Sequence, residues 1–261
     1  MLNKTSIEKH LSKDLISQVE IQVFDTISST NDVAKELKLS AEKTSALIAA
    51  NHQSKGRGRL NRTFYSPESA GIYMTLLMPA LPMDRLLLAT PAAAVASARA
   101  IRKVSGRGIE IKWVNDLYMG ESKIGGILTE AVTDYKNGTI THLAVGIGIN
   151  CVDTDMPEDE RNKIGSLASP EMDRNKLTAE VFIQLAQIFE EIEKGDISFM
   201  DSYRNLSNIV GKEITVYKSH MDLSNGCPAV ATDIDDQGNL VVQYEDGTVE
   251  HLSSGEVSVR I

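Results

Sequence analysis

The sequence holds little cysteine and no apolar run long enough to cross a membrane. Its two cysteines, Cys151 and Cys227, lie far apart without CxxC spacing, so they offer neither a disulfide framework nor a zinc site. The most apolar segment, residues 86–98, is interrupted by Pro91 and is shorter than the ~20 residues of a membrane-spanning helix. The N-terminal segment lacks the apolar stretch of a signal peptide. We therefore expect a cytoplasmic protein that is not inserted in a membrane.

Positive charge is also in deficit. The chain has 27 Lys and Arg residues against 36 Asp and Glu residues, a formal net charge of −9, which argues against a general nucleic-acid binder or a protein of anionic membrane surfaces. Much of the deficit lies in residues 212–261, which carry 3 basic and 9 acidic side chains. One segment reverses the balance, because Lys55, Arg57, Arg59 and Arg62 stand within eight residues that contain no acid.

Several familiar catalytic motifs are absent. The five histidines form neither HExxH nor another closely spaced ligand pair, so we assign no metal-binding residues. The sequence contains no GxSxG elbow and no GxxxxGK[ST] phosphate loop. Gly146 and Gly148 lack the third glycine of a dinucleotide-binding loop. Two glycines in a strand more often allow another group to approach the backbone closely.

The pattern of apolar residues predicts a mixture of helices and hairpin-linked strands. Apolar segments bounded by turn residues predict strands over residues 19–24, 46–51, 71–77, 108–114, 124–132 and 142–149, with a hairpin turn at Asn137-Gly138. Helical spacing predicts helices over residues 83–104, 178–194 and 198–209, with Pro91 in a first turn or at a kink. A further helix begins after residue 29 or 30, where Ser29 and Asp32 resemble a capping box.

The pattern of predicted secondary structure changes after Gly211. From there the chain shows short strand candidates separated by turn signals, a pattern typical of a small β-barrel or sandwich. A length of 261 residues suits one sizeable domain with a small appendage. We therefore expect an α+β domain with a mixed or antiparallel sheet over residues 1–211 and a small all-β domain over residues 212–261.

The basic loop, residues 53–62, allows three interpretations. Gly56 and Gly58 let backbone amides approach a ligand, while the arginines offer planar donor forks that suit carboxylate and phosphate oxygens. A solvated surface loop explains the charge pattern equally simply. A nucleic-acid patch is a third possibility, but the loop contains no interleaved aromatic residues.

A second cluster of polar residues lies at the end of the strand predicted over residues 108–114. Lys112, Asn115 and Asp116 stand close together, and Lys123 comes seven residues after Asp116, beside two glycines. This arrangement can place an ammonium group where an anionic ligand meets the backbone. The alternative is that Trp113 belongs to the core and that the asparagine and aspartate only build a turn.

Taken together, these motifs resemble those of biotin protein ligases. The matching blocks occur in family order: Ser29-Thr30-Asn31, Gln53-x-x-Gly56-Arg57-Gly58-Arg59-x-x-Arg62, Lys112-Trp113-x-Asn115-Asp116-Leu117, Lys123-x-x-Gly126-Ile127-Leu128-x-Glu130, Gly146-x-Gly148-x-Asn150 and Gly255-Glu256-Val257-Ser258-x-Arg260. The chain departs from the family pattern at three positions, where Asn61, Phe64 and Val114 replace the common glycine, tryptophan and proline.

The resemblance implies a fold, substrates and partners. It implies a class II synthetase-like catalytic domain, as in biotin and lipoate ligases, followed by an SH3-like domain. The substrates would be biotin and ATP, with Mg²⁺ accompanying ATP, and the partner a biotin carboxyl carrier protein or domain. A homodimer is expected, with the strand around residues 139–145 as its contact edge. Only about 20 residues precede the first predicted strand, too few for a helix-turn-helix domain with its supporting core, so we predict neither repression nor nucleic-acid binding.

The resemblance also implies roles for individual residues. Lys123, Arg59 and Asp116 would be catalytic. Biotin would contact Ser29, Thr30, Asn31, Gln53, Arg57, Gly58, Arg59, Lys123 and Gly126, and ATP would contact Arg59, Arg62, Lys112, Asn115 and Asn150. The expected reaction forms biotinyl-5′-AMP and then transfers biotin to a carrier lysine.

Two other functions stay open. Lipoate ligases and octanoyl transferases resemble biotin ligases in fold and also modify carrier lysines, although the basic loop combined with KWxND favours biotin. A nucleic-acid-binding module that uses the basic loop is the non-enzymatic alternative, and it predicts salt-sensitive binding without ATP chemistry.

Overall fold

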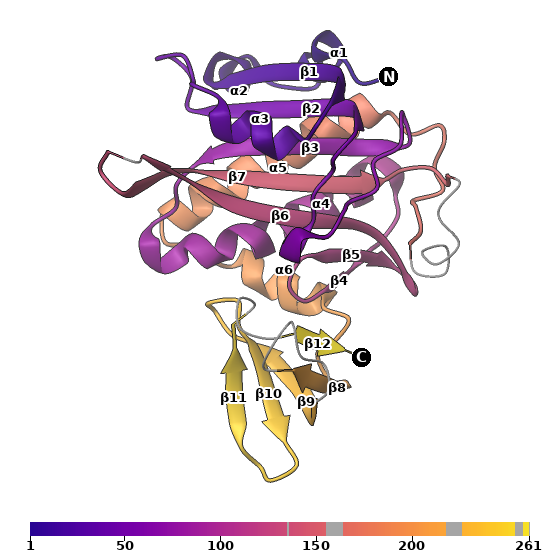
Figure 1. Ribbon diagram of the computed structural model, residues 1–261, viewed down its shortest axis with the longest axis vertical. Helices are drawn as coiled ribbons and strands as arrows, with labels where there is room; N and C mark the ends of the chain where they lie inside the picture. Colours follow the sequence, from indigo (N-terminus) through magenta and orange to yellow (C-terminus); the bar gives the residue numbers. More distant parts are fainter. Residues whose placement is uncertain (135, 155–163, 218–225, 254–257, 261) are drawn as a thin grey trace.

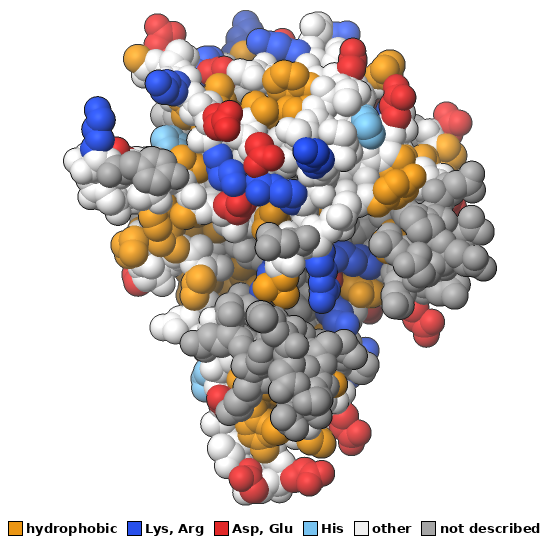
Figure 2. Space-filling model, viewed as in Figure 1, with side chains coloured by type: hydrophobic (Ala, Val, Ile, Leu, Met, Phe, Trp, Pro, Cys, Tyr) orange, Lys and Arg blue, Asp and Glu red, His pale blue; other side chains and the backbone are white. Residues whose placement is uncertain are grey.

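The computed structural model places a large sheet with helices above a smaller β domain (Figure 1). It describes residues 1–134, 136–154, 164–217, 226–253 and 258–260. The space-filling view shows acidic side chains at the far end of the smaller domain (Figure 2). The chain thus has the α+β part and the small all-β part that its sequence pattern predicts.

The large sheet has seven strands in the order β1-β2-β3-β7-β6-β5-β4, and only the β1–β2 pair is parallel. The mixed sheet of an α+β fold is therefore confirmed. The strands are β1 (Val19–Ile27), β2 (Ser45–Gln53), β3 (Gly71–Pro79), β4 (Glu110–Lys112), β5 (Asp116–Met119), β6 (Ser122–Asp134) and β7 (Thr139–Asn150).

The strand expected over residues 108–114 is shorter in the structure, and a further strand follows it. Strand β4 ends at Lys112, and β5 pairs with both β4 and β6. The four residues of β5 are too few to show a period-two pattern, so the sequence indicated a turn there. The peptide between Trp113 and Val114, in the connection, is cis.

Two faces of the sheet are covered by different helices. On one face, α4 (Ala89–Ser105) packs against α5 (Arg174–Glu193), and on the other lies α3 (Thr30–Glu36) (Figure 1). Strand β2 alternates between them, since Leu47 belongs to the core beneath α4 and α5 while Ile48 packs with the α3 side. Because α4 is rich in buried alanine, its backbone can lie close to its neighbours.

Helix boundaries differ from the expected ones for local reasons. The segment expected to be helical from residue 83 begins as the 3-10 helix η2 (Met83–Leu88), and Pro91 then lies in the first turn of α4, as predicted. Helix α5 starts at residue 174 because the Asp173 carboxylate accepts hydrogen bonds from two backbone amides of the first turn. The remaining helices are α1 (Lys4–Glu8), α2 (Lys13–Gln18) and α6 (Phe199–Leu206).

The contact edge expected at residues 139–145 is only partly open. Residues 142–145 of β7 pair with β3 on one side and with β6 on the other, whereas Thr139 and Ile140 pair with β6 alone. The strands at the ends of the sheet are β1 and β4. Residues 142–145 thus offer no free edge because β7 is central there, which the chain order of the strands does not reveal, and the homodimer stays a prediction.

The smaller domain is a five-stranded antiparallel sheet in the order β11-β10-β9-β8-β12. Its strands are β8 (Glu213–Tyr217), β9 (Cys227–Ile234), β10 (Leu240–Tyr244), β11 (Val249–Leu252) and β12 (Ser258–Arg260). Within the terminal motif, residues 255–257 lie outside the described residues, while β12 pairs with β8.

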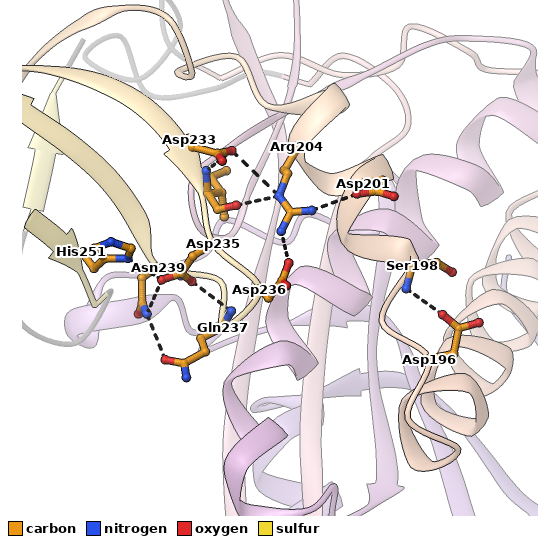
Figure 3. Close-up of polar contacts among 11 residues, drawn as sticks. Asp196, Ser198, Asp201, Arg204, Asp233, Asp235, Asp236, Gln237, Asn239 and His251 are labelled. Carbon is orange, nitrogen blue, oxygen red and sulfur yellow. Dashed lines mark hydrogen bonds and ion pairs between the residues drawn. The ribbon is translucent and has the colours of Figure 1, made fainter. Parts of the chain in front are cut away.

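Arg204 on α6 joins the two domains. Its guanidinium contacts Asp201 at 2.9 Å on its own helix and Asp236 in the β9–β10 turn, and Asp233 lies 3.9 Å away (Figure 3). Its Nε also donates a hydrogen bond of 2.6 Å to the carbonyl of Ile234. One cation is thus shared by several acceptors of the C-terminal domain.

A second contact between the domains involves the connection between β4 and β5. Trp113 Nε1 donates a hydrogen bond of 2.9 Å to the carbonyl of Gly238 in the β9–β10 turn. The neighbouring carbonyl of Val114 accepts a hydrogen bond of 2.8 Å from the buried Tyr203 hydroxyl on α6. The turn of the small domain therefore abuts the polar segment that starts at Asn115.

Candidate active site

A cavity of about 690 Å³ opens on the face of the sheet that carries α3. Its walls come from α3, the basic loop and strands β2 to β7, so residues far apart in the sequence meet there. Thirteen of the fourteen predicted site residues line it: Ser29, Thr30, Asn31, Gln53, Arg57, Gly58, Arg59, Arg62, Lys112, Asn115, Asp116, Lys123 and Gly126.

Asn150 is the predicted residue that the structure does not bring into the cavity. Its side-chain nitrogen donates a hydrogen bond of 2.9 Å to the carbonyl of Gly165, and its own carbonyl accepts one from the Leu167 amide. The Gly165 amide in turn bonds the carbonyl of Lys123 at 2.9 Å. Asn150 thus supports the segment that runs beside Lys123, and the predicted contact with ATP has no support in the geometry.

One end of the cavity is polar but uncharged. Gln53 Oε1 accepts hydrogen bonds from the Thr30 amide at 2.8 Å and from the Thr30 hydroxyl at 3.1 Å, and its Nε2 donates to Ser66 at 3.0 Å. Ser29 is the N-cap residue of α3, yet its side chain makes no capping bond. The predicted capping box is therefore wrong, and the side chain of Gln53 serves the first amide of the helix instead.

A row of hydroxyl and amide groups continues behind this end. Thr75 Oγ1 lies 2.6 Å from Asn31 Oδ1 and 2.8 Å from Thr30 Oγ1. The two threonine hydroxyls have two hydrogens for three contacts, counting the one to Gln53. The Thr30 hydrogen consequently has competing acceptors, and its hydroxyl can turn to a ligand without leaving a buried group unpaired.

The glycines of β7 allow two side chains to approach its backbone. A Cβ atom at Gly146 would lie 2.2 Å from Asn31 Oδ1, and one at Gly148 would lie 2.4 Å from Phe64 Cζ. The interpretation of these glycines as sites of close approach is confirmed. Phe64 lines the cavity and makes an edge contact with Tyr73, so an aromatic wall is kept where the family commonly has tryptophan.

The opposite end of the cavity is cationic. Lys123 Nζ lies 2.6 Å from Asp116 Oδ1, and both come from the paired strands β5 and β6. Gly126 lies across from Asp116, and a Cβ atom there would be about 3.6 Å from both charged groups. Lys112 completes this end, with its ammonium 5.9 Å from the ring centroid of Tyr118.

Arg59 connects the basic loop to this cationic end. Its Nη1 donates a hydrogen bond of 3.0 Å to Asn115 Oδ1, while Asn115 Nδ2 donates to the carbonyl of Ile127 at 3.1 Å. Burial lowers the pKa of Arg59, and the nearby Asp116 carboxylate acts in the opposite direction. The guanidinium still carries its charge, because arginine does not lose a proton in proteins. Asn115 thus fixes a cation that faces the cavity.

Arg57 lines the cavity, but its charge is engaged at the rim. Its Nη2 lies 2.5 Å from Asp32 on α3 and 3.3 Å from Glu130 on β6. Burial acts to raise the pKa of Glu130, but hydrogen bonds from Lys35 and Asn31, together with the charges of Lys35 and Arg57, hold that pKa below its usual value. Glu130 is therefore an anion that binds the loop.

The cavity lining carries a strong excess of positive charge. Five cationic side chains line it, those of Arg57, Arg59, Arg62, Lys112 and Lys123, and Asp116 is the one carboxylate among the described lining residues. Figure 2 shows Lys and Arg side chains gathered on this face. In a chain of net charge −9 this local excess favours an anionic ligand.

Several lining residues were not predicted from the sequence. Most are apolar walls: Met74, Ile127, Leu128, Ile147 and Ile164. Thr63 and Tyr118 are polar, and Tyr118 lies two residues after Asp116 on β5, on the same face of the strand. The period of the strand could have identified it, had β5 been recognised.

The fold and the site define a class of protein. A cavity with an uncharged polar end and a cationic end, in a mixed-sheet domain followed by a small β domain, suits a ligase that joins a carboxylic acid to a nucleotide. Within the part of the chain that the structure describes, no helix is long and apolar enough to cross a membrane, and no group of metal-ligating side chains occurs.

Comparison with known proteins identifies the family. Residues 23–150 match the Biotin/lipoate A/B protein ligase family, and residues 228–260 match the Biotin protein ligase C terminal domain. The chain therefore belongs to the biotin protein ligase family. The predicted resemblance is confirmed, and the lipoate alternative is not favoured, because the C-terminal match is to the Biotin protein ligase C terminal domain.

Individual relatives agree along most of their length. The bifunctional ligase/repressor BirA of Salmonella typhimurium is 27% identical over 250 residues, which cover 92% of this chain and 74% of that protein. The biotin--[acetyl-CoA-carboxylase] ligase of Mycobacterium tuberculosis is 26% identical over 249 residues, covering 91% and 88%. A biotin protein ligase from Aquifex aeolicus, solved with biotin and ATP, superposes with a TM-score of 0.77 at 24% identity and covers 92% of this chain and 98% of its own. This last likeness concerns the fold.

Proposed function

We propose that this protein activates biotin with ATP and transfers it to a lysine of a carboxyl carrier protein or domain. The observation that carries the proposal is the cavity itself, in which an uncharged polar end and a cationic end meet. Biotin has a neutral ring system and a carboxylate, and ATP adds a triphosphate, so the two ends match the two kinds of group.

The first step joins two anions, which explains the cationic end. A carboxylate oxygen of biotin attacks the α-phosphorus of ATP, the bond to the β-phosphate breaks, and biotinyl-5′-AMP and pyrophosphate result. Positive charge fixed in a partly enclosed cavity offsets the repulsion between the reactants and stabilises charge in the transition state. Lys123 donates to the biotin carboxylate and the bridging phosphate, while Arg59, Arg62 and Lys112 face the triphosphate.

The second step uses the same cavity. The neutral amine of a carrier lysine attacks the acyl carbon of the mixed anhydride, AMP leaves with the electron pair of the broken C–O bond, and the amine releases a proton as the amide forms. Asp116, 2.6 Å from Lys123, orients that lysine and the incoming amine. Ser29, Thr30, Gln53, Gly126 and the backbone at Arg57 to Arg59 hold biotin, and Asn31 supports Thr30 through Thr75.

Further features belong to the same proposal. Mg²⁺ enters as part of the ATP substrate and screens its phosphates. The relative from Mycobacterium tuberculosis is named for acetyl-CoA carboxylase, and we infer a carrier of that type here. We also propose a domain boundary between residues 211 and 212, an SH3-like arrangement of the C-terminal strands, a cytoplasmic location and a homodimer.

The proposal is tested by the exchange of pyrophosphate into ATP. The full-length protein is incubated with Mg²⁺, ATP and labelled pyrophosphate, with biotin, lipoate, octanoate or no acid added. We expect exchange that depends on biotin and is at least about 100-fold slower with the other acids, since neither carries the polar, hydrogen-bonding ring system of biotin that the uncharged end binds. Equal exchange with lipoate or octanoate, or none with biotin, would overturn it.

A further inference from the structure

The side chain of Arg57 behaves differently from its neighbours in the basic loop. Arg59 turns to Asn115 inside the cavity, and Arg62 is exposed. Arg57 instead bridges two carboxylates outside the loop, Asp32 on α3 and Glu130 on β6. Two anions balance its single charge, so it contributes little to the positive potential that faces a ligand.

Glu130, the carboxylate on β6 that pairs with Arg57, is fixed by further hydrogen bonds. Glu130 accepts hydrogen bonds of 2.8 Å from Asn31 and from Lys35, both on α3. Asn31 is buried and fixed by Thr75, and it packs against the backbone of Gly146. The receiving side of the contact is thus a network anchored in three strands and a helix, and not a flexible surface pair.

The loop is attached at its start, where the Ser54 and Lys55 amides donate to the carbonyls of Ile27 and Ser28, and at Arg59, which donates to Asn115. Backbone hydrogen bonds from the Gly58 amide to Arg62 and from the Phe64 amide to Gly56 close the loop on itself. They shape the loop but do not attach it to the sheet. Arg57 makes a further attachment, on the α3 side of the cavity, where the loop forms part of the wall.

We propose that Arg57, Asp32 and Glu130 form a latch that holds the basic loop over the cavity and so retains the acyl adenylate until the acceptor amine arrives. The retention part rests on the proposed function, whereas the attachment of the loop does not. Arg57 is a positioning residue in this proposal. It acts through the loop, and its side chain makes no bond to the reacting atoms.

The latch is tested with Arg57→Met, Asp32→Asn, the double variant and Arg57→Lys. Arg102→Met, an exposed arginine on α4, is the matched control. In the ligand-free full-length protein, hydrogen exchange of the peptide over residues 54–64 should speed up about fivefold in Arg57→Met, since half-exposed ion pairs of this kind are individually weak. Asp32→Asn should have a smaller effect, Arg57→Lys should restore part of the protection, and the control should match the unchanged protein.

The double variant separates a latch from a general loss of structure. If Asp32 acts through Arg57, exchange in the double variant should be no faster than in Arg57→Met alone. Additive effects, or loop exchange unchanged in Arg57→Met, would overturn the latch. This readout requires no ligand, so it decides the attachment of the loop even if pyrophosphate exchange fails.

A second readout tests retention. Biotinyl-5′-AMP formed on the protein should dissociate about fivefold to tenfold faster from Arg57→Met and, to a smaller extent, faster from Asp32→Asn. Asp32 is not one of the proposed catalytic or binding residues, so the maximal rate of biotin-dependent pyrophosphate exchange in Asp32→Asn should stay within about twofold of the unchanged protein. Unchanged adenylate release in both variants would contradict the retention part of the proposal.

Discussion

The cavity and the junction between the domains use charge in opposite ways. At the junction, one arginine lies among three aspartates and a carbonyl, and its donors are taken up by the protein (Figure 3). In the cavity, Arg57 is paired with Asp32 and Glu130, but four other lining cations stand beside a single carboxylate, Asp116, among the described lining residues. Charge that holds a fold together is balanced within the fold, whereas charge meant for a ligand is left in excess. The comparison predicts that junction charges govern stability and cavity charges govern activity.

The largest effect should follow removal of the ammonium at the cationic end. Lys123→Ala should lower biotin-dependent pyrophosphate exchange by roughly 100-fold to 1,000-fold, because a preorganised charge at the reacting centre is lost. Thermal unfolding should change little, and Lys38→Ala, at an exposed position, is the matched control. Exchange close to that of the unchanged protein would remove Lys123 from the chemistry.

A steric change at the cavity wall should have the next largest effect. In Gly148→Ala the new methyl group would meet the Phe64 ring at 2.4 Å, so the aromatic wall must move. The KM for biotin should rise roughly tenfold to 100-fold, as expected when a binding group is displaced by about an ångström. Gly108→Ala is the control, since a Cβ atom there meets nothing within 4 Å. Equal KM values in the two variants would show that the wall does not contact biotin.

The junction should respond in stability and not in activity. Arg204→Met removes the cation shared by Asp201, Asp233 and Asp236, and we expect a loss of about 1 kcal/mol in the free energy of unfolding, because these pairs are partly exposed. Pyrophosphate exchange should stay within about twofold. Urea unfolding measures the first quantity, with Arg102→Met for comparison. A fall in pyrophosphate exchange well beyond twofold, with an unchanged free energy of unfolding, would contradict the contrast between the two regions.

The smallest expected effect is on the stability of the protein at acidic pH. The pKa of Glu130 is lowered in the folded protein, so its contribution to stability is present above the unfolded value of 4.5 and is lost as the pH falls through the lower folded value. Between pH 5 and pH 3 the unchanged protein should therefore lose more stability than Glu130→Gln does. Urea midpoints at several pH values measure the difference, and Glu42→Gln serves as a control at an exposed position. Identical pH dependence in Glu130→Gln would show that the network does not hold the carboxylate charged.

Local patterns in the sequence were enough to predict much of the fold. Apolar segments bounded by turn residues located six of the seven strands of the large sheet, and the turn signals after Gly211 located the small domain. The basic loop and the KWVND segment were each open to more than one interpretation, and only the family motifs connected them. Their meeting in one cavity depends on strand order, which the sequence does not state, because β2 and β5 lie far apart in the sheet.

What sequence reasoning missed depends on long-range contacts. Arg57 meets Glu130 across 73 residues, and Asn31 meets the same carboxylate across 99. Nothing in either segment shows that the other is its partner. Asn150 is a different case, since the family motif predicted a ligand contact, while in the structure its amide donates to the carbonyl of Gly165 and the residue lies outside the cavity lining.

The chain contains a single tryptophan, and its position makes it an optical probe. Trp113 lines the cavity, and its indole nitrogen is bonded to the turn of the small domain. Its fluorescence should therefore change when a ligand enters and also when the small domain separates from the catalytic one. No label has to be introduced to follow either event.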